Sequence, residues 1–176
     1  MRKLLIVVDM QKDFVDGALG SKEAVAIVDN VVKKIEDFDG DIIVTYDTHP
    51  EHYMQTQEGK HLPVPHCIKG TDGWKLDSKV QTAVDQKGYH AMEKPTFGST
   101  ELPEYIKANY NPDDIEIELI GLCTDICVVS NALLLKANFT EAKISVDASC
   151  CAGVTPESHR AALTTMQMCQ VNVTEA

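Results

Sequence analysis

The pattern that most limits the folds open to this chain is an apolar strand followed almost at once by an apolar helix. Apolar and acidic residues alternate over 115–120, which is typical of a strand. Gly121 would end that strand, and the apolar segment 128–137 predicts a helix after a tight turn. Thr124 and Asp125 are natural capping residues for its start. The sequence here therefore predicts a strand, a turn and a helix in direct succession.

A cysteine lies where this helix is expected to begin. Backbone N–H groups are unpaired in a first helical turn, and the helix dipole favours an anion there. Cys127 is therefore expected to have a lowered pKa and a more populated thiolate. Cys123 lies in the turn before it. Cysteine is also a common small buried hydrophobic residue, so the local pattern leaves a purely structural role open for both thiols.

Strand-like and helix-like segments alternate through the rest of the chain. Strands are expected at 4–8, 42–46, 89–92, 115–120, 143–146 and 171–173. Helices are expected at 21–38, 77–86, 100–110, 128–137 and 156–168, with a polar loop and a short helical turn at 50–65. Repeated strand-then-helix units predict an α/β fold with a mostly parallel, six-stranded sheet covered by helices on both faces. Residues 1–176 are expected to form a single domain.

Charge and targeting patterns exclude several classes of partner. With 16 basic and 27 acidic residues, the formal charge is −11, which disfavours binding to nucleic acid or to an anionic membrane. The apolar start of the chain is too short for a signal peptide, and no apolar run approaches transmembrane length. We therefore expect a cytoplasmic protein. The six cysteines show no disulfide spacing, and Cys150 and Cys151 are expected to be reduced and structural.

Ligands of parallel α/β sheets bind beyond the carboxyl ends of the strands. Carboxylates, an imidazole, an ammonium group and thiols are expected at those ends and would meet along one edge of the sheet. The residues are Asp9, Asp47, His49, Lys94, Cys123, Cys127 and Asp147. The sequence contains no glycine-rich motif of the kind that binds nucleotides.

Three of these residues have complementary chemistry. The thiolate of Cys127 would attack a carbonyl, and Lys94 would favour the anion. Asp9, desolvated at the end of a buried strand, would act as general base and then as general acid. The alternative is that Asp9 and Lys94 form a structural ion pair.

A second group of residues has the composition of a metal site. Asp47 and His49 lie two positions apart on an extended segment, so their side chains point the same way, and prolines stiffen the segment that holds His66. Two imidazoles and one carboxylate suit zinc, iron or manganese. Neighbouring residues that offer further ligands are Glu58, His52, His61 and Cys67. A solvated polar loop is the alternative.

Three aromatic residues lie near these groups in the sequence. Phe14, Trp74 and Phe97 would form the walls of a pocket for a flat ring. Each can equally be an ordinary core residue.

Five segments, in order along the chain, resemble the motifs of the isochorismatase-like cysteine hydrolase family, and of its nicotinamidase/pyrazinamidase subgroup in particular. Their sequences are VDMQKDF at 8–14, DTHP at 47–50, PHC at 65–67 followed by Gly70 and Thr71, KPTFGS at 94–99, and GLCTDICV at 121–128. The resemblance covers nearly the whole chain and implies a doubly wound sheet. It also implies a cis peptide bond at Leu122–Cys123.

The resemblance assigns roles to individual residues. It implies that Asp9, Lys94 and Cys127 are catalytic, with Cys127 rather than Cys123 as the nucleophile. It implies an oxyanion hole formed by the backbone N–H groups of Cys123 and Cys127. Asp47, His49 and His66 would bind a divalent metal, foremost zinc, with Glu58 as a further candidate ligand.

The reaction implied is hydrolysis of nicotinamide to nicotinate and ammonia through a cysteine thioester, with the metal positioning the substrate. Two other hypotheses stay open at this point. One is a related cysteine amidase that acts on another small amide or ureide. The other is a non-catalytic α/β module that binds a small ligand. Relatives are often oligomeric, so a homo-oligomer also stays open.

Overall fold

The computed structural model describes residues 1–175. Its centre is one six-stranded sheet in the order β3-β2-β1-β4-β5-β6, and every pairing between neighbouring strands is parallel. The strands are β1 (Arg2–Val8), β2 (Asp41–Asp47), β3 (His90–Lys94), β4 (Ile115–Leu122), β5 (Lys143–Ala152) and β6 (Asn172–Thr174). The chain winds outward from β1 to β3 and then returns to β4 beside β1. The predicted fold class is therefore confirmed, with its switch point between β1 and β4.

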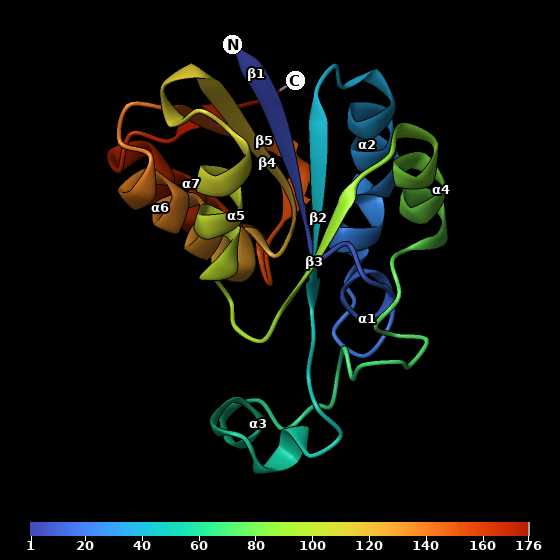
Figure 1. Ribbon diagram of the computed structural model, residues 1–176. Coiled ribbons are helices and arrows are strands. Elements are labelled where there is room, and N and C mark those ends of the chain that lie inside the picture. The colour runs from blue at the N-terminus through green and yellow to red at the C-terminus, as the bar shows by residue number, and fades with distance from the viewer. Residues whose placement is uncertain (176) are drawn as a thin grey trace.

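Helices cover both faces of the sheet (Figure 1). One side carries α1 (Lys12–Val15), α2 (Lys22–Asp37) and α4 (Ser78–Lys87), and the other carries α5 (Glu101–Asn109), α6 (Val129–Asn138) and α7 (Pro156–Met168). An extension beyond the carboxyl ends of the strands contains η1 (Tyr53–Gln55) and α3 (Gln57–His61). The short turns η2 (Pro112–Asp114) and η3 (Thr124–Val128) precede β4 and α6. Within residues 1–175, no helix combines the length and apolar character that crossing a membrane requires.

The central strand β1 explains why its sequence is a continuous apolar run. Side chains alternate between the two faces of a strand. Leu5 and Val7 belong to the core under α2 and α4, whereas Leu4, Ile6 and Val8 belong to the core under α5, α6 and α7. All five are completely buried. A strand that is covered on both faces has no solvent-facing position that would favour a polar residue.

The first long helix, α2, follows the predicted periodicity. The hydroxyl of Ser21 caps it by accepting a hydrogen bond from the N–H of Ala24 at 3.0 Å, a contact worth about 1 kcal/mol. Its buried residues recur at helical spacing and face the sheet. They are Ala24, Ile27, Val28, Val31 and Ile35. The helix ends at Asp37, one residue before the end predicted from the sequence.

The predicted end of β4 was wrong. The strand continues through Gly121 to Leu122, and Gly121 has a φ of +116°. A Cβ atom at Gly121 would collide with the backbone carbonyl oxygen of Val8 on β1. Glycine therefore serves a close approach of two central strands at the switch point, rather than the end of a strand.

The predicted helix caps were wrong as well. Thr124 and Asp125 lie inside η3, a π-helical turn whose N-cap is Cys123. The hydroxyl of Thr124 is hydrogen-bonded to Nδ1 of His159 at 2.7 Å, and the carboxylate of Asp125 accepts from the N–H of Val154. Both side chains join η3 to the segment around the start of α7 instead of capping the helix.

Candidate active site

The carboxyl ends of four neighbouring strands, β3, β2, β1 and β4, meet at one edge of the sheet. In the parallel register, Asp47 at the end of β2 is paired with Lys94 at the end of β3. Asp9 follows β1 directly, and Cys127 follows β4 after the η3 turn. The predicted convergence of these residues is confirmed. It brings together side chains that are up to 118 positions apart in the sequence (127 − 9).

Asp9 and Lys94 form the buried centre of this edge. The Nζ of Lys94 lies 2.6 Å from Oδ2 of Asp9, and neither side chain is exposed. The other carboxylate oxygen, Oδ1, accepts a hydrogen bond from the hydroxyl of Thr45 at 2.6 Å. Oδ2 has no hydrogen bond of good geometry among the described residues. Its contact with Lys94 is an ion pair, and a carboxylate oxygen has a second lone pair that can accept a proton.

The ammonium group of Lys94 lies between a carboxylate and a thiol. Besides its ion pair with Asp9, it donates to the carbonyl oxygen of Thr96 at 3.0 Å and to Sγ of Cys127 at 3.4 Å. An ammonium group has three N–H bonds. Two of them are donated to Thr96 and Cys127, and together with the ion pair to Asp9 these contacts fix the position of the charge.

The ionisation states of the three groups follow from burial and from their mutual contacts. Burial alone would lower the pKa of Lys94, but the charges of Asp9, Cys127 and Asp47 raise it above its ordinary value. Burial raises the pKa of Asp9 and outweighs the opposing effect of Lys94. Burial and the nearby Asp9 also raise the pKa of the Cys127 thiol well above its ordinary value, against the effect of Lys94.

The expectation of a lowered pKa at Cys127 was therefore wrong. The residue does lie at the start of the helical segment, but it is only 4% exposed and faces a carboxylate. Desolvation of an anion outweighs a helix dipole. The resting thiol is neutral, and it needs a base before it can attack a carbonyl. The peptide bond Leu122–Cys123 is cis, as the family resemblance implied.

Four side chains next to this centre form a cluster that could hold a metal ion. They are Asp47, His49, Glu58 and His66, and one nitrogen or oxygen atom of each lies within 4.8 Å of the others. Asp47 Oδ2 lies 3.0 Å from Nε2 of His49 and 3.5 Å from Nε2 of His66. Glu58 Oε1, from α3, lies 3.6 Å and 3.8 Å from the same two nitrogens.

The geometry selects among the candidate ligands. Glu58 joins the cluster, whereas His52 and His61 are exposed and Cys67 lies outside it. Two imidazoles and two carboxylates fit a divalent ion such as zinc, iron or manganese. Asp47, His49 and His66 are almost completely buried, where polar side chains need partners. The donor set therefore fits a divalent metal.

Backbone contacts hold the cluster in place. His66 Nδ1 lies 2.8 Å from the carbonyl oxygen of Val64, so Nε2 faces the cluster. The side chain of Gln11 binds both the N–H and the carbonyl oxygen of Asp47, at 2.7 and 2.9 Å. The carboxylate of Asp13 accepts from the N–H of Cys67, beside His66. The segment that follows β1 is therefore hydrogen-bonded to the backbone on which the cluster is built.

The charges within the cluster support one another. Burial alone would raise the pKa of Asp47, but hydrogen bonds from His49 and His66 hold it well below its usual range. Burial alone would lower the pKa of His66, but Asp47 and the carbonyl of Val64 raise it. Burial raises the pKa of Glu58.

The three aromatic residues all lie beside members of the site. The ring of Phe14 is 5.4 Å from that of His66, measured between centroids. Trp74 donates from Nε1 to the hydroxyl of Thr48, within the segment that carries Asp47 and His49. Phe97 is 48% exposed in the segment after Lys94, so it is not a core residue.

Several residues of the site were missed by sequence reasoning. The ring of Tyr53 is buried and packs edge-on against both His49 and His66. Gln11 could have been found from its place inside the segment 8–14. Asn131, which contacts the backbone of Cys127, carries no signal in the sequence because buried asparagine has no pattern of its own.

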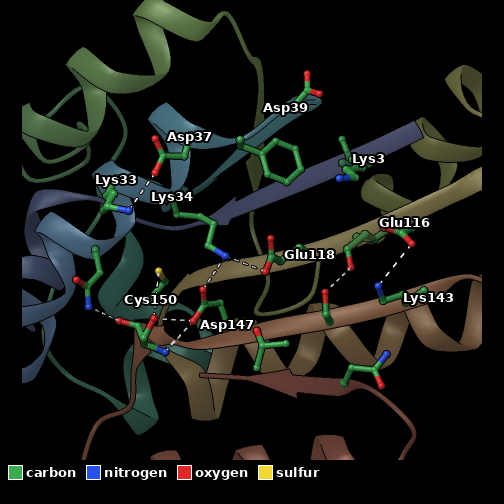
Figure 2. A pocket seen from close by; sticks show the side chains of 18 residues that line it. Lys3, Lys33, Lys34, Asp37, Asp39, Glu116, Glu118, Lys143, Asp147 and Cys150 are labelled. Atoms are coloured by element: carbon green, nitrogen blue, oxygen red, sulfur yellow. Dashed lines mark hydrogen bonds and ion pairs between the residues drawn. The ribbon is translucent and has the colours of Figure 1, made fainter. Parts of the chain in front are cut away.

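Asp147 was expected at this edge and does not lie there. β5 runs six residues further than predicted, from 146 to Ala152, so Asp147 lies inside the strand. Its carboxylate faces a groove of about 580 Å³ over the β4–β6 part of the sheet and pairs with Lys34 of α2, at 2.7 Å (Figure 2). Lys34 also binds Glu118 at 3.1 Å. This ion-pair network is separate from the thiol and the metal cluster.

Comparison with known proteins gives a consistent result. A family model described as the isochorismatase domain matches residues 3–176. An uncharacterized isochorismatase family protein, PncA, of Bacillus subtilis is 32% identical over 76% of this chain and 78% of its own length. The nicotinamidase/pyrazinamidase of Mycobacterium tuberculosis is 27% identical over 97% of each chain. The crystal structure of nicotinamidase/pyrazinamidase PncA from Bacillus subtilis has a TM-score of 0.86 at 27% identity, covering 99% of this chain and 100% of that one.

Proposed function

Because the chain belongs to the isochorismatase domain family, we propose that it is an amide hydrolase that converts nicotinamide to nicotinate and ammonia. The observation that carries this proposal is the buried row of Asp9, Lys94 and Cys127 at the switch point of the sheet, directly beside a four-ligand cluster. Two relatives similar over nearly their whole length are named nicotinamidase/pyrazinamidase.

The first step is activation of the thiol. Asp9 takes the proton of Cys127 on Oδ2, the carboxylate oxygen that has no hydrogen bond of good geometry. Lys94 stays charged and stabilises the thiolate from 3.4 Å. Burial raises the pKa of Asp9, which makes its carboxylate a stronger base for the Cys127 proton.

The thiolate then attacks the amide carbonyl carbon and forms a C–S bond. The backbone N–H groups of Cys123 and Cys127 hold the negative oxygen. Asp9 returns its proton to the nitrogen as the C–N bond breaks, so ammonia and a thioester are formed. Asp9 next takes a proton from water, which attacks the thioester carbonyl. As the C–S bond breaks, Asp9 gives its proton to the sulfur, which restores the Cys127 thiol, and the product acid loses its own proton to solvent and leaves as nicotinate.

We assign metal binding to Asp47, His49 and His66, with Glu58 as a further ligand, and zinc as the ion that suits these ligands best. Iron and manganese are the alternatives. A bound divalent ion supplies a Lewis-acid site that orients a polar atom of the substrate. Phe14, Trp74 and Phe97 would form the walls around its flat ring.

We further propose that residues 1–176 act as a single domain in the cytoplasm, with a small molecule as partner and a role in NAD salvage. The formal charge of −11 disfavours nucleic acid and anionic membranes as partners.

The test is ammonia release from nicotinamide by wild-type protein, by chelated protein and by Cys127→Ala. Loss of release in both of the last two supports the whole proposal. Release that depends on Cys127 but survives chelation keeps the catalytic residues and removes the role of the metal. Absence of ammonia release from metal-loaded wild-type protein would refute nicotinamide as the substrate. A panel of small amides and ureides would then identify the related activity.

A further inference from the structure

A completely buried asparagine joins the two segments that carry the catalytic lysine and cysteine. Asn131 lies on α6, one helical turn after Cys127, and is 0% exposed. Its Nδ2 donates to the carbonyl oxygen of Cys127 at 2.8 Å and to that of Phe97 at 3.2 Å. Its Oδ1 accepts from the N–H of Ser99 at 2.9 Å. One side chain thus holds three backbone groups from two separate segments.

The segment on the far side of this bridge begins with Lys94. Residues 95–97 are exposed and belong to no helix or strand. The segment is tied at its start by the Lys94 ammonium, which donates to the carbonyl oxygen of Thr96. At its end, Ser99 is tied by Asn131, and Gly98 packs against Ser130 of α6. Between the two ties lies Phe97, whose ring is not held by burial.

The helix side of the bridge is the backbone of the nucleophile. The carbonyl oxygen of Cys127 accepts a hydrogen bond from the side-chain amide of Asn131, and its thiol accepts one from the ammonium group of Lys94. Displacing this carbonyl relative to the 94–99 segment would change the distance between Lys94 Nζ and Cys127 Sγ. A shift of about 1 Å at a catalytic group can lower a rate by about 100-fold.

We propose that Asn131 is a positioning residue that sets the separation between the Lys94 ammonium and the Cys127 thiol and that holds the backbone of Phe97. It does not touch the reacting atoms, and it acts through the backbone of the two segments. The part of this inference that concerns turnover rests on the proposed function, whereas the part that concerns the reactivity of the thiol does not.

Two variants separate hydrogen bonding from packing. Asn131→Ala removes all three hydrogen bonds. Asn131→Asp keeps the size and the acceptor for the Ser99 N–H, but turns a second oxygen toward the carbonyl oxygens of Cys127 and Phe97. Asn138→Ala is the matched control, because Asn138 lies on the same helix and its side-chain partners within residues 1–175 are Leu134 and Lys107, outside the site.

The test has two readouts. One is kcat and KM for nicotinamide as a function of pH. The other is the rate of Cys127 alkylation by iodoacetamide as a function of pH, with peptide mapping to distinguish the other cysteines. Both Asn131 variants are expected to lose about 10- to 100-fold in kcat and to change the pH profile of alkylation. In Asn131→Asp, protonation of the new carboxyl restores a donor, so its kcat relative to wild type rises as the pH falls. The same ratio for Asn131→Ala stays flat. Asn138→Ala keeps the wild-type kcat and alkylation profile.

Folded Asn131 variants with wild-type kcat and alkylation profiles would overturn the proposal and leave the nicotinamidase assignment intact. If wild-type protein does not hydrolyse nicotinamide, but alkylation of Cys127 still depends on Asn131, the substrate assignment fails and the positioning role stands. If Asn131→Ala does not fold, the ratio of Asn131→Asp to wild type decides: a ratio that does not change with pH overturns the proposal.

Discussion

Asp9 and Lys94 form an ion pair at 2.6 Å in which neither side chain is exposed to solvent. The partners come from the ends of β1 and β3, which are separated in the sheet by β2. Removing one partner leaves the other buried without its counter-charge, whereas replacing both by neutral groups of similar size does not. A double replacement should therefore preserve stability better than a single one, although both remove catalytic groups.

Lys94→Met is expected to destabilise the protein by about 3–5 kcal/mol, because it leaves Asp9 unpaired. Asp9→Asn/Lys94→Met should recover most of that loss and remain inactive. Urea unfolding of the three proteins measures the free energies of unfolding. A single variant as stable as wild type would contradict the buried ion pair, and an active double variant would contradict the proposed mechanism.

The thiol of Cys127 is expected to react slowly with iodoacetamide at neutral pH. Because its pKa is raised by burial and by Asp9, the thiolate fraction should still be rising with pH above about 9, the usual range for a free cysteine. Asp9→Asn removes the carboxylate that raises this pKa, so alkylation at neutral pH should become faster while amide hydrolysis is lost. Rates at Cys127 are followed by peptide mapping.

The exposed Cys169 provides the internal control for this experiment, since its alkylation should be the same in both proteins. A plateau in the Cys127 rate near neutral pH in wild-type protein would show a lowered pKa and would contradict the neutral resting thiol.

Metal binding should stabilise the fold, because the four ligands are brought together only in the folded chain. At a zinc concentration about 100 times Kd, the gain in the free energy of unfolding is about 2.7 kcal/mol. Thermal unfolding with and without zinc should show this gain in wild-type protein, a smaller one in Glu58→Gln and none in His66→Ala.

His61→Ala is the matched control for the metal experiment. His61 lies in the same segment, is exposed, and its ring forms a hydrogen bond with the carbonyl oxygen of Gln57, outside the cluster. It should keep the full stabilisation by zinc. Equal stabilisation of His66→Ala and wild type would place the metal elsewhere.

Gly121→Ala should be strongly destabilising, by more than about 2 kcal/mol, because its Cβ would collide with the backbone of Val8 and its φ is +116°. Gly70→Ala separates the two effects. Gly70 also has a positive φ, +85°, but a Cβ atom there would meet no described residue within 4 Å. It should lose only about 1 kcal/mol from backbone strain. Similar losses in both variants, measured by urea unfolding, would argue against the close approach of β1 and β4.

Much of the architecture was predictable because it depends on local periodicity. The buried run of β1 and the capped, amphipathic α2 were visible in the spacing of apolar residues. The edge that carries Asp9, Asp47, Lys94 and Cys127 followed from the same pattern, since parallel strands place their carboxyl ends together. The end of β5 was not predictable, because Asp147 and Ser149 resemble loop residues although they continue the strand.

The sequence by itself determined the order of strands and helices, and with it the residues that follow each strand. Only the tertiary structure decided that Glu58 faces His49 and His66, that Asp147 pairs with Lys34, that Asn131 bridges two segments, and that the pKa of Cys127 is raised. The physical reason is range. Periodicity acts between residues a few positions apart, whereas desolvation, charge interactions and ligand proximity depend on distances in space between residues that lie far apart in the chain.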